Sequence, residues 1–175
     1  MSGILEGRVA IITGAGGGLG AAHARVFAAE GCAVIVNDIN VEAAQAVVDE
    51  ITAAGGKAAV NSSDITNYDD SLNAVKQAID SYGDLHIVVN NAGVNRDRMF
   101  ASMTEQEWDT IMAVHLKGHF CISSHAVHYW RGQSKEGKAV DARIINTTSG
   151  AGLQGSIGQS NYAAAKAGIA ALTLN

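Results

Sequence analysis

The stretch RVAIITGAGGGLG, Arg8 to Gly20, decides the fold class. Its first six residues form a short apolar run that ends at glycines, a pattern typical of a buried parallel strand. The glycines that follow Thr13 let the backbone turn tightly and approach a phosphate, which then rests on the N-terminus of the next helix. Apolar residues recur at helical spacing from Leu19 until Gly31 closes that helix. A flexible glycine turn is the alternative, but the position between a strand and a helix favours phosphate binding.

The alternation of short apolar runs and amphipathic helical segments continues along the chain. We expect further strands at 33–38, 57–64, 85–93 and 142–150, and helices at 40–56, 67–83, 104–130 and from 161 onward. Thr104 can cap the longest helix, with Glu107 in the capping-box position. Strands that alternate with such helices pair in parallel through right-handed crossovers, so the sequence predicts an α/β fold with an open, doubly wound parallel sheet. No linker or internal repeat interrupts it, and we interpret residues 1–175 as a single domain.

The composition narrows the classes of function. Hydrophobic residues make up 47% of the 175, enough for one domain with a substantial core. A formal net charge of −5 argues against binding to nucleic acid or to an anionic membrane surface. We see neither a membrane-spanning apolar stretch nor a signal peptide, and therefore expect a soluble, cytoplasmic protein. Cys32 and Cys121 lie in apolar runs and are expected to be buried thiols rather than a disulfide.

Two features of the sequence suggest that it lacks a C-terminal portion. It has no proline, although an average usage of about 5% would give roughly nine. It also stops at AALTLN, residues 170–175, within a helical pattern and without a capping residue or a glycine. Both observations lead us to expect that a C-terminal portion is absent.

Candidate ligand-binding residues follow the strands, because open α/β sheets bind ligands at the carboxyl ends of their strands. Asp38 comes directly after the second expected strand, eighteen residues past Gly20. A carboxylate there can accept hydrogen bonds from an adenosine ribose and would repel a 2′-phosphate. No lysine or arginine lies between Gly31 and Lys57, so NAD is favoured over NADP. The alternative is that Asp38 caps the next helix or turn.

Three side chains near the end of the sequence suggest chemistry. Tyr162 and Lys166 are four residues apart, which places both on one face of a helix. Ser149 ends the fifth expected strand, thirteen residues before Tyr162. Because a strand end and the start of the next helix can converge, these three side chains could line one cleft. Taken alone, the tyrosine and lysine would more often be a surface pair.

With these motifs the sequence resembles a short-chain dehydrogenase/reductase of the NAD-preferring type. The resemblance rests on TGAGGGLG (13–20), NNAG (90–93), and Ser149 with YAAAK (162–166), in the family's order and spacing over essentially the entire chain. It implies a Rossmann-type doubly wound parallel sheet with helices on both faces. It also implies a nicotinamide cofactor and hydride transfer between a secondary alcohol and a ketone.

The resemblance assigns roles to individual residues. Tyr162 matches the catalytic acid/base, Lys166 the group that lowers its pKa and binds the nicotinamide ribose, and Ser149 the serine that orients the substrate oxygen. A free tyrosine has a pKa near 10, which is why the base needs a cationic neighbour at neutral pH. The implied cofactor-binding residues are Gly14, Gly18, Leu19, Gly20, Asp38, Asp64, Ile65, Asn91, Ala92, Gly93, Tyr162 and Lys166.

The chain departs from the family pattern at two places. His115 stands where many members have an asparagine that completes a water-mediated proton relay, and some members that act on fatty acyl thioesters or steroids look similar here. Imidazole can hold a water or pass a proton, with a pKa near 6.5 that would make the relay pH-sensitive. The second departure is that the C-terminal strands and the substrate-covering loop of the family are missing. In the loop after NNAG, Arg96 and Arg98 could meet an anionic substrate group or be solvated charges.

Partners and alternatives complete the expectations. The segment YAAAKAGIAALTL (162–174) is apolar nearly all round, so it should be buried on two sides, and with helix 104–130 it suggests a homo-oligomer. Burial by the missing C-terminal segment is the alternative. The histidine pairs at 115/119 and 125/128 lack further ligands at zinc-site spacing, and no metal is expected. A catalytically silent NAD-binding scaffold or redox sensor is the alternative to an alcohol dehydrogenase or ketoreductase acting on a small molecule.

Overall fold

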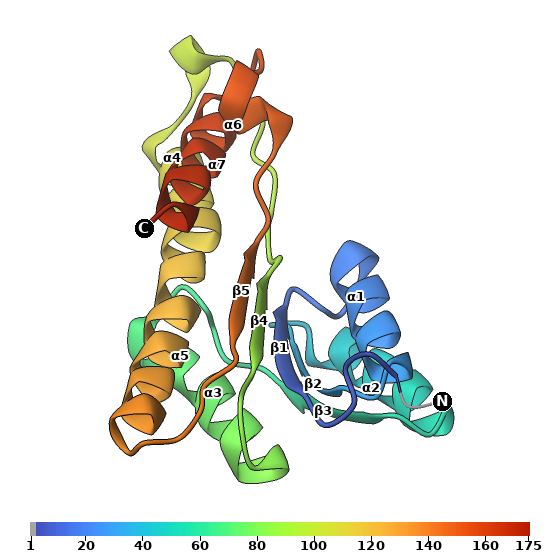
Figure 1. The fold of residues 1–175 in the computed structure, drawn as a ribbon. Coiled ribbons are helices and arrows are strands. Elements are labelled where there is room, and N and C mark those ends of the chain that lie inside the picture. The colour runs from blue at the N-terminus through green and yellow to red at the C-terminus, as the bar shows by residue number, and fades with distance from the viewer. Residues whose placement is uncertain (1–2) are drawn as a thin grey trace.

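The computed structural model describes residues 3–175, which form a five-stranded parallel sheet in the order β3-β2-β1-β4-β5 (Figure 1). The strands are β1 (Val9–Thr13), β2 (Ala33–Asn37), β3 (Lys57–Asn61), β4 (Ile87–Asn90) and β5 (Arg143–Asn146). In the register of the central strands, Ile11 of β1 lies opposite Ile35 of β2 and Val88 of β4. The order reverses direction between β1 and β4, which creates the switch point where open sheets bind ligands.

The helices are α1 (Gly18–Ala29), α2 (Val41–Ala53), α3 (Tyr68–Tyr82), α4 (Glu105–Ile111), α5 (Gly118–Lys135), α6 (Gly150–Gln154) and α7 (Ser160–Thr173), with a 3₁₀ turn η1 (Phe100–Ser102) and a π-helical segment η2 (Met112–Lys117). Ala10 and Ile12 of β1 pack with buried residues of α1 and α2. Val9 and Ile11 pack with those of α3 and α5 on the opposite face. The predicted doubly wound sheet with helices on both faces is therefore confirmed.

Local capping contacts set the helix ends, and those at Gly31 and Thr104 were expected. Asn40 and Asn67 cap α2 and α3 by accepting the N–H groups of Ala43 and Asp70. Thr104 and Glu107 form the predicted capping box at the start of α4. Gly31 follows α1 in the left-handed conformation, with a φ of 88°, which a glycine adopts without strain.

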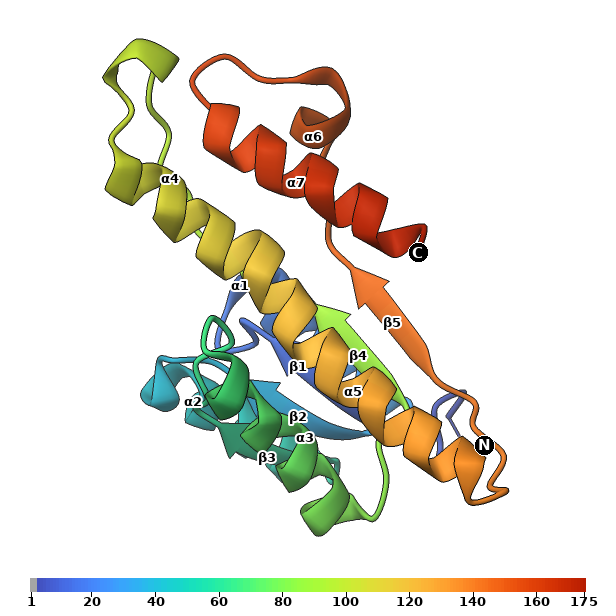
Figure 2. The ribbon, with the colours of Figure 1, turned by 90° about the vertical axis from the view of Figure 1, so that its left-hand side faces the viewer.

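The long helix predicted at 104–130 is interrupted. Its helical turns at 112–117 are π-helical, and the helix then continues to Lys135 (Figure 2). A π-helical turn is favoured only where packing outweighs the poorer helical geometry, and such turns recur at functional sites. Here the turn holds the buried His115 beside Val94 in the loop after β4, and Gly118 follows the turn where a Cβ would approach Ile65 Cδ1 to 2.8 Å.

The strand ends also differ from the prediction. The strands expected at 57–64, 85–93 and 142–150 stop at Asn61, Asn90 and Asn146, and the residues beyond them turn into loops. Ser149 caps the short helix α6, which the sequence pattern did not indicate. Figure 2 shows α7 running beside the α4–α5 helix and packing on α6. The carboxyl ends of the strands, α6 and α7 thus meet on one side of the sheet.

Candidate active site

The glycine loop is built around close approaches of backbone to backbone. Gly14 has a φ of 63°, and a Cβ on it would lie 2.7 Å from Ala92 Cα. A Cβ on Gly20, in the first turn of α1, would lie 2.2 Å from the Gly14 oxygen. Gly18 also has a positive φ, of 52°, but no atom lies within 4 Å of its Cβ position. Steric contact therefore requires glycine at positions 14 and 20, and the positive φ favours glycine at position 18. Without side chains, the loop leaves its backbone accessible to a ligand.

Asn91 fastens the loop after β4 to the glycine loop. Its Nδ2 donates to the Thr13 oxygen at 3.0 Å and to the Gly14 oxygen at 3.3 Å. The Thr13 hydroxyl in turn accepts the N–H groups of Asn91 and Ala92 at 3.0 and 3.1 Å. The NNAG motif thus holds the glycine loop in place, a role that adds to the cofactor contact implied for Asn91 to Gly93.

Asp38 lies at the end of β2 and lines the same cleft as the glycine loop. Its Oδ2 accepts the Gly16 N–H at 3.0 Å, and its Oδ1 accepts the Asn40 N–H at 2.9 Å. The carboxylate therefore fixes both the glycine loop and the turn into α2. Asp38 thus has the turn-stabilising role that was considered as an alternative, and it also lines the cleft.

Asp64 and Ile65 lie away from the cleft. Ile65 is buried in the core on the α3 and α5 side of the sheet. Asp64 accepts hydrogen bonds from the backbone and hydroxyl of Thr66 at 2.8 Å, and its own N–H donates to Asp70 at 2.7 Å. Neither residue lines the cavity that contains the glycine loop, so their adenine-binding role stays a prediction.

Tyr162, Lys166 and His115 converge at the other end of that cleft. The Lys166 Nζ lies 5.5 Å from the centroid of the Tyr162 ring. The His115 ring meets the Tyr162 ring edge-on, with centroids 5.1 Å apart and planes at 88°. Helix α7 and the π-helical segment pack together, and this contact brings residues 47 positions apart in sequence into one cluster.

Lys166 is buried, with 2% of its surface exposed. Its Nζ donates to the Thr147 oxygen at 2.6 Å, and its own carbonyl accepts the Thr148 hydroxyl at 2.7 Å. Burial lowers the pKa of Lys166 to about 8, because desolvation disfavours the ammonium form. The residue is still mainly protonated at neutral pH and presents a poorly solvated positive charge to Tyr162.

His115 is also buried, and burial lowers its pKa below the usual value. Its Nε2 lies 2.8 Å from the Val94 oxygen and 3.1 Å from the Val94 nitrogen. Its Nδ1 is buried without a hydrogen-bond partner among residues 3–175. A Cβ on Gly93 would lie 2.5 Å from His115 Cε1, so the glycine of NNAG makes room for the imidazole.

Ser149 does not line the cleft. Its hydroxyl oxygen accepts the Ala151 N–H at 3.2 Å and caps α6, which packs on α7. At Gly152 of α6, a Cβ would lie 2.6 Å from the Ala167 nitrogen, so small residues bring the two helices into close contact. The role of Ser149 in orienting a substrate oxygen stays a prediction.

The cleft has a volume of about 450 Å³ and joins the glycine loop to the tyrosine. Its lining residues are Gly14, Gly17, Leu19, Asp38, Asn91, Gly93, Val94, Asn95, His115, Thr147, Tyr162 and Lys166. Sequence reasoning assigned no role to four lining residues that lie within or near the recognised motifs: Gly17, Val94, Asn95 and Thr147. Thr147 contributes its backbone carbonyl, so its side-chain type carried no signal.

A dinucleotide fits this set of residues. Among residues 3–175, no atom lies within 4 Å of the Cβ positions of Gly17 and Gly18, and the loop precedes the N-terminus of α1, where backbone N–H groups favour a phosphate. Asp38 and the buried Lys166 line the same cleft. Within residues 3–175, no three His, Cys, Asp or Glu side chains gather as a metal site. None of the helices described there is long and apolar enough to cross a membrane.

Comparison with known proteins decides the family. The short chain dehydrogenase family matches residues 8–175, nearly the entire chain. The chain belongs to this family. Its structure is similar to the crystal structure of a short chain dehydrogenase from Mycobacterium avium, with 58% sequence identity and a TM-score of 0.96 over 98% of this chain. The resemblance inferred from the motifs is therefore confirmed.

Several curated short chain dehydrogenases are also similar. The hydroxyacyl-CoA dehydrogenase ChsB1 of Mycobacterium tuberculosis is 49% identical over 98% of this chain. The peroxisomal multifunctional enzyme type 2 of Mus musculus is 43% identical over 95% of the chain. The 3-oxoacyl-[acyl-carrier-protein] reductase FabG of Thermotoga maritima is 37% identical over 97%. The chain spans 56%, 23% and 66% of these proteins, and 62% of the M. avium chain.

Proposed function

We propose that the protein is an oxidoreductase that transfers a hydride between NAD(H) and a secondary alcohol or ketone. One observation carries the proposal: a buried lysine lies 5.5 Å from the ring of Tyr162 in a cleft that begins at the glycine loop. Burying a lysine is unfavourable because desolvation disfavours its charge, and here the lysine lies beside a tyrosine and bonds the Thr147 oxygen just after β5. Membership of the short chain dehydrogenase family supports the same reaction class.

In this proposal Tyr162 is the acid/base. Its hydroxyl gives a proton to the carbonyl oxygen during reduction, and its phenolate takes the proton from the alcohol hydroxyl during oxidation. The Lys166 ammonium, held by the Thr147 carbonyl, stabilises the phenolate. Ser149 orients the substrate oxygen, and the unpartnered Nδ1 of His115 holds a water that exchanges protons with the site. Bound nicotinamide supplies or accepts the hydride.

The glycine loop and Asp38 would hold the adenosine and phosphate part of the cofactor. The N-terminus of α1 faces the phosphates, and Asp38 accepts hydrogen bonds from the ribose while disfavouring a 2′-phosphate. Asn91 to Gly93 form the wall beside the nicotinamide, with Lys166 on its ribose. NAD is therefore the proposed cofactor.

The proposed substrate is a 3-hydroxyacyl thioester or a steroid-like alcohol. His115 in place of the relay asparagine supports this class, as do the names of the relatives, among them a hydroxyacyl-CoA dehydrogenase and a 3-oxoacyl-[acyl-carrier-protein] reductase. Oxidation in the presence of NAD is the proposed direction. The cytoplasmic location stays a prediction, and several relatives are named as peroxisomal enzymes.

We also propose that the protein is a homo-oligomer. An apolar groove of about 480 Å³ lies between the α4–α5 helix and α7, lined by Met112, Ala113, Leu116, Lys117, Phe120 and Leu172. Phe120 is 49% exposed, and its ring stacks on Tyr68 with centroids 5.9 Å apart. Exposed aromatic surface of this kind favours a subunit contact, and cover by further chain is the alternative.

A fluorescence titration with NADH and NADPH, followed by turnover of a 3-hydroxyacyl-CoA with NAD, tests the function. We expect NADH to bind more tightly than NADPH, and Tyr162→Phe to abolish turnover while leaving NADH affinity unchanged. Near-normal turnover by Tyr162→Phe would refute the catalytic role. Cofactor binding with no turnover of a range of alcohols and ketones would instead favour the silent scaffold or redox sensor.

A further inference from the structure

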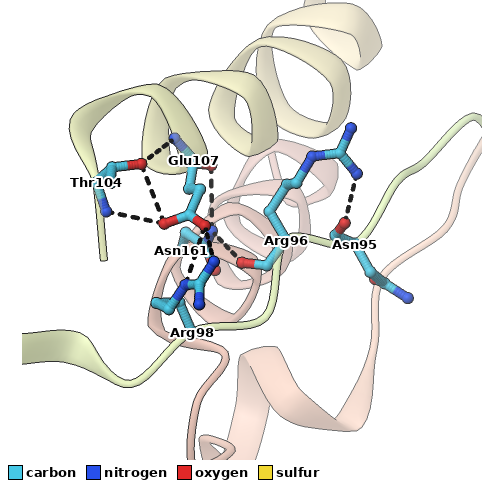
Figure 3. A network of polar contacts seen from close by, with 6 residues as sticks. All are labelled: Asn95, Arg96, Arg98, Thr104, Glu107 and Asn161. Carbon is cyan, nitrogen blue, oxygen red and sulfur yellow. Dashed lines mark hydrogen bonds and ion pairs between the residues drawn. The ribbon is translucent and has the colours of Figure 1, made fainter. Parts of the chain in front are cut away.

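Asn161, directly before Tyr162, is fully buried and uses its amide on three backbone segments. Its Nδ2 donates to the Arg96 oxygen at 3.1 Å and to the Glu107 oxygen at 3.2 Å. Its Oδ1 accepts the N–H of Tyr162 at 2.8 Å. Figure 3 shows the side chain lying between the loop after β4, helix α4 and the start of α7. Both N–H groups of the Asn161 amide therefore have hydrogen-bond acceptors, as a buried amide requires.

The start of α7 needs such a partner. The first N–H groups of a helix have no acceptor within the helix, and the residue before α7, Gln159, makes no side-chain capping bond. Asn161 supplies the acceptor for the N–H of Tyr162 from within the first turn. The backbone of the tyrosine is thus held by the same side chain that reaches α4 and the loop after β4.

Glu107 makes a second connection between the same segments. Its Oε1 accepts from Arg98 Nε at 3.0 Å and Nη2 at 2.8 Å, and its Oε2 accepts from the N–H and hydroxyl of Thr104. The N–H of Arg98 donates to the oxygen of Gly158, two residues before α7. Arg98, one of the two arginines considered for an anionic substrate group, is therefore committed to this network (Figure 3).

The ring of Tyr162 depends on this support. Its contacts with His115 and Lys166 are an edge-on ring contact at 5.1 Å and a cation above the ring at 5.5 Å. Neither is a hydrogen bond, so neither fixes the ring as narrowly as a short polar contact would. The backbone of the first turn of α7 therefore contributes to the position of the Tyr162 ring in the cleft.

We propose that Asn161 is a positioning residue for Tyr162, with Glu107 and Arg98 supporting it. Asn161 holds the first turn of α7 at a fixed distance from α4 and from the loop that carries Val94, the partner of His115. This inference rests on the proposed role of Tyr162 as the acid/base. A displacement of about 1 Å at such a group is enough to cost a hundredfold in rate.

The experiment compares Asn161→Ala with wild type and with Val75→Ala, a core variant of α3 outside the network. Three quantities are measured well below the unfolding temperature: NADH affinity, kcat with a 3-hydroxyacyl-CoA, and the nuclear Overhauser effect between the Tyr162 and His115 rings. Asn161→Leu is the second variant, because it keeps a side chain of similar size while it removes both amide donors and the acceptor for the Tyr162 N–H.

We expect Asn161→Ala to lower kcat by about ten- to a hundredfold with NADH affinity within twofold of wild type, and to weaken the ring-to-ring signal. Val75→Ala should keep kcat and the signal despite its lower stability. Unchanged kcat and an unchanged signal in Asn161→Ala would overturn the inference. If wild type itself fails to turn over, the proposed function fails, while the ring signal still decides the positioning role. If Asn161→Ala does not fold, Asn161→Leu decides it by the same signal: a weakened ring-to-ring signal supports the positioning role, and an unchanged one overturns it.

Discussion

Gly20→Ala tests how tightly the glycine loop is packed. A Cβ at this position would lie 2.2 Å from the Gly14 oxygen and 2.6 Å from Asn91 Nδ2. Both distances are far below the optimal separation of about 3.5 Å between non-bonded heavy atoms. The closest atom belongs to the backbone and cannot rotate away, so α1 and the loop must move apart. The hydrogen bonds from Asn91 to the oxygens of Thr13 and Gly14 would be strained by that movement.

The expected cost follows from three contributions. Overpacking of this kind costs about 1–3 kcal/mol. Loss of the two Asn91 hydrogen bonds costs about 0.5–1.5 kcal/mol each. Alanine gains about 1 kcal/mol over glycine within a helix, which offsets part of the loss. The net expectation is a free energy of unfolding lower by about 3 kcal/mol, equivalent to a Tm lower by roughly 6–12 °C for a chain of this size.

Urea unfolding followed by tryptophan fluorescence measures the effect, with NADH titration on the same samples. Gly132→Ala in α5 is the matched control, because no atom lies within 4 Å of its Cβ position and the same substitution there should stabilise by about 0.5–1 kcal/mol. Loss of NADH binding should accompany the destabilisation in Gly20→Ala. A free energy of unfolding within about 0.5 kcal/mol of wild type would refute the packing argument.

Three further outcomes follow from buried or paired titratable groups. The hydrogen bonds from Arg98 and from the N–H of Thr104 hold the pKa of Glu107 at about 2. Its carboxylate therefore stabilises the fold above about pH 4.5, and this stabilisation is lost as the pH falls towards 2. In Glu107→Gln, the free energy of unfolding should depend less on pH within that window. Burial lowers the pKa of His119 to about 3, so below about pH 6.5 this imidazole is protonated in the unfolded chain but not in the folded one. The free energy of unfolding therefore falls between pH 6.5 and 3, and His119→Gln should reduce that fall in urea titrations. Burial raises the pKa of the Cys32 thiol to about 12 and also raises that of Cys121, so neither should react with a disulfide reagent at pH 8 until urea is added; rapid labelling of the native protein would contradict this.

Much of the fold was predictable because its signals are local. The apolar run before Gly14 and the glycines up to Gly20 mark a strand, a turn and a helix within thirteen residues. Asn40, Asn67 and the Thr104 capping box begin their helices through contacts between residues three positions apart. Such contacts depend on sequence spacing alone, so a pattern predicts them well.

The convergence of Tyr162 with Lys166 was predictable for the same reason, since one helical turn joins them. Their meeting with His115 was expected only through family resemblance, and its geometry depends on packing between α7 and the π-helical segment. No periodicity predicts that segment, because a π-helical turn depends on its packing with α4, α5 and α7 rather than on sequence spacing. The short helix capped by Ser149 was missed for a similar reason.

The sequence alone determined the order of the elements, the parallel sheet, the glycine loop and the tyrosine–lysine pair, because each depends on residues near one another in the chain. Only the tertiary structure decided that Ile65 enters the core, that Asp38 holds the Gly16 N–H, and that Asn161 joins three backbone segments. These contacts link positions 22 to 65 residues apart, apart from the bond within α7. Asparagine and aspartate fit many polar environments equally well, so their residue type does not reveal which distant backbone group each will bind.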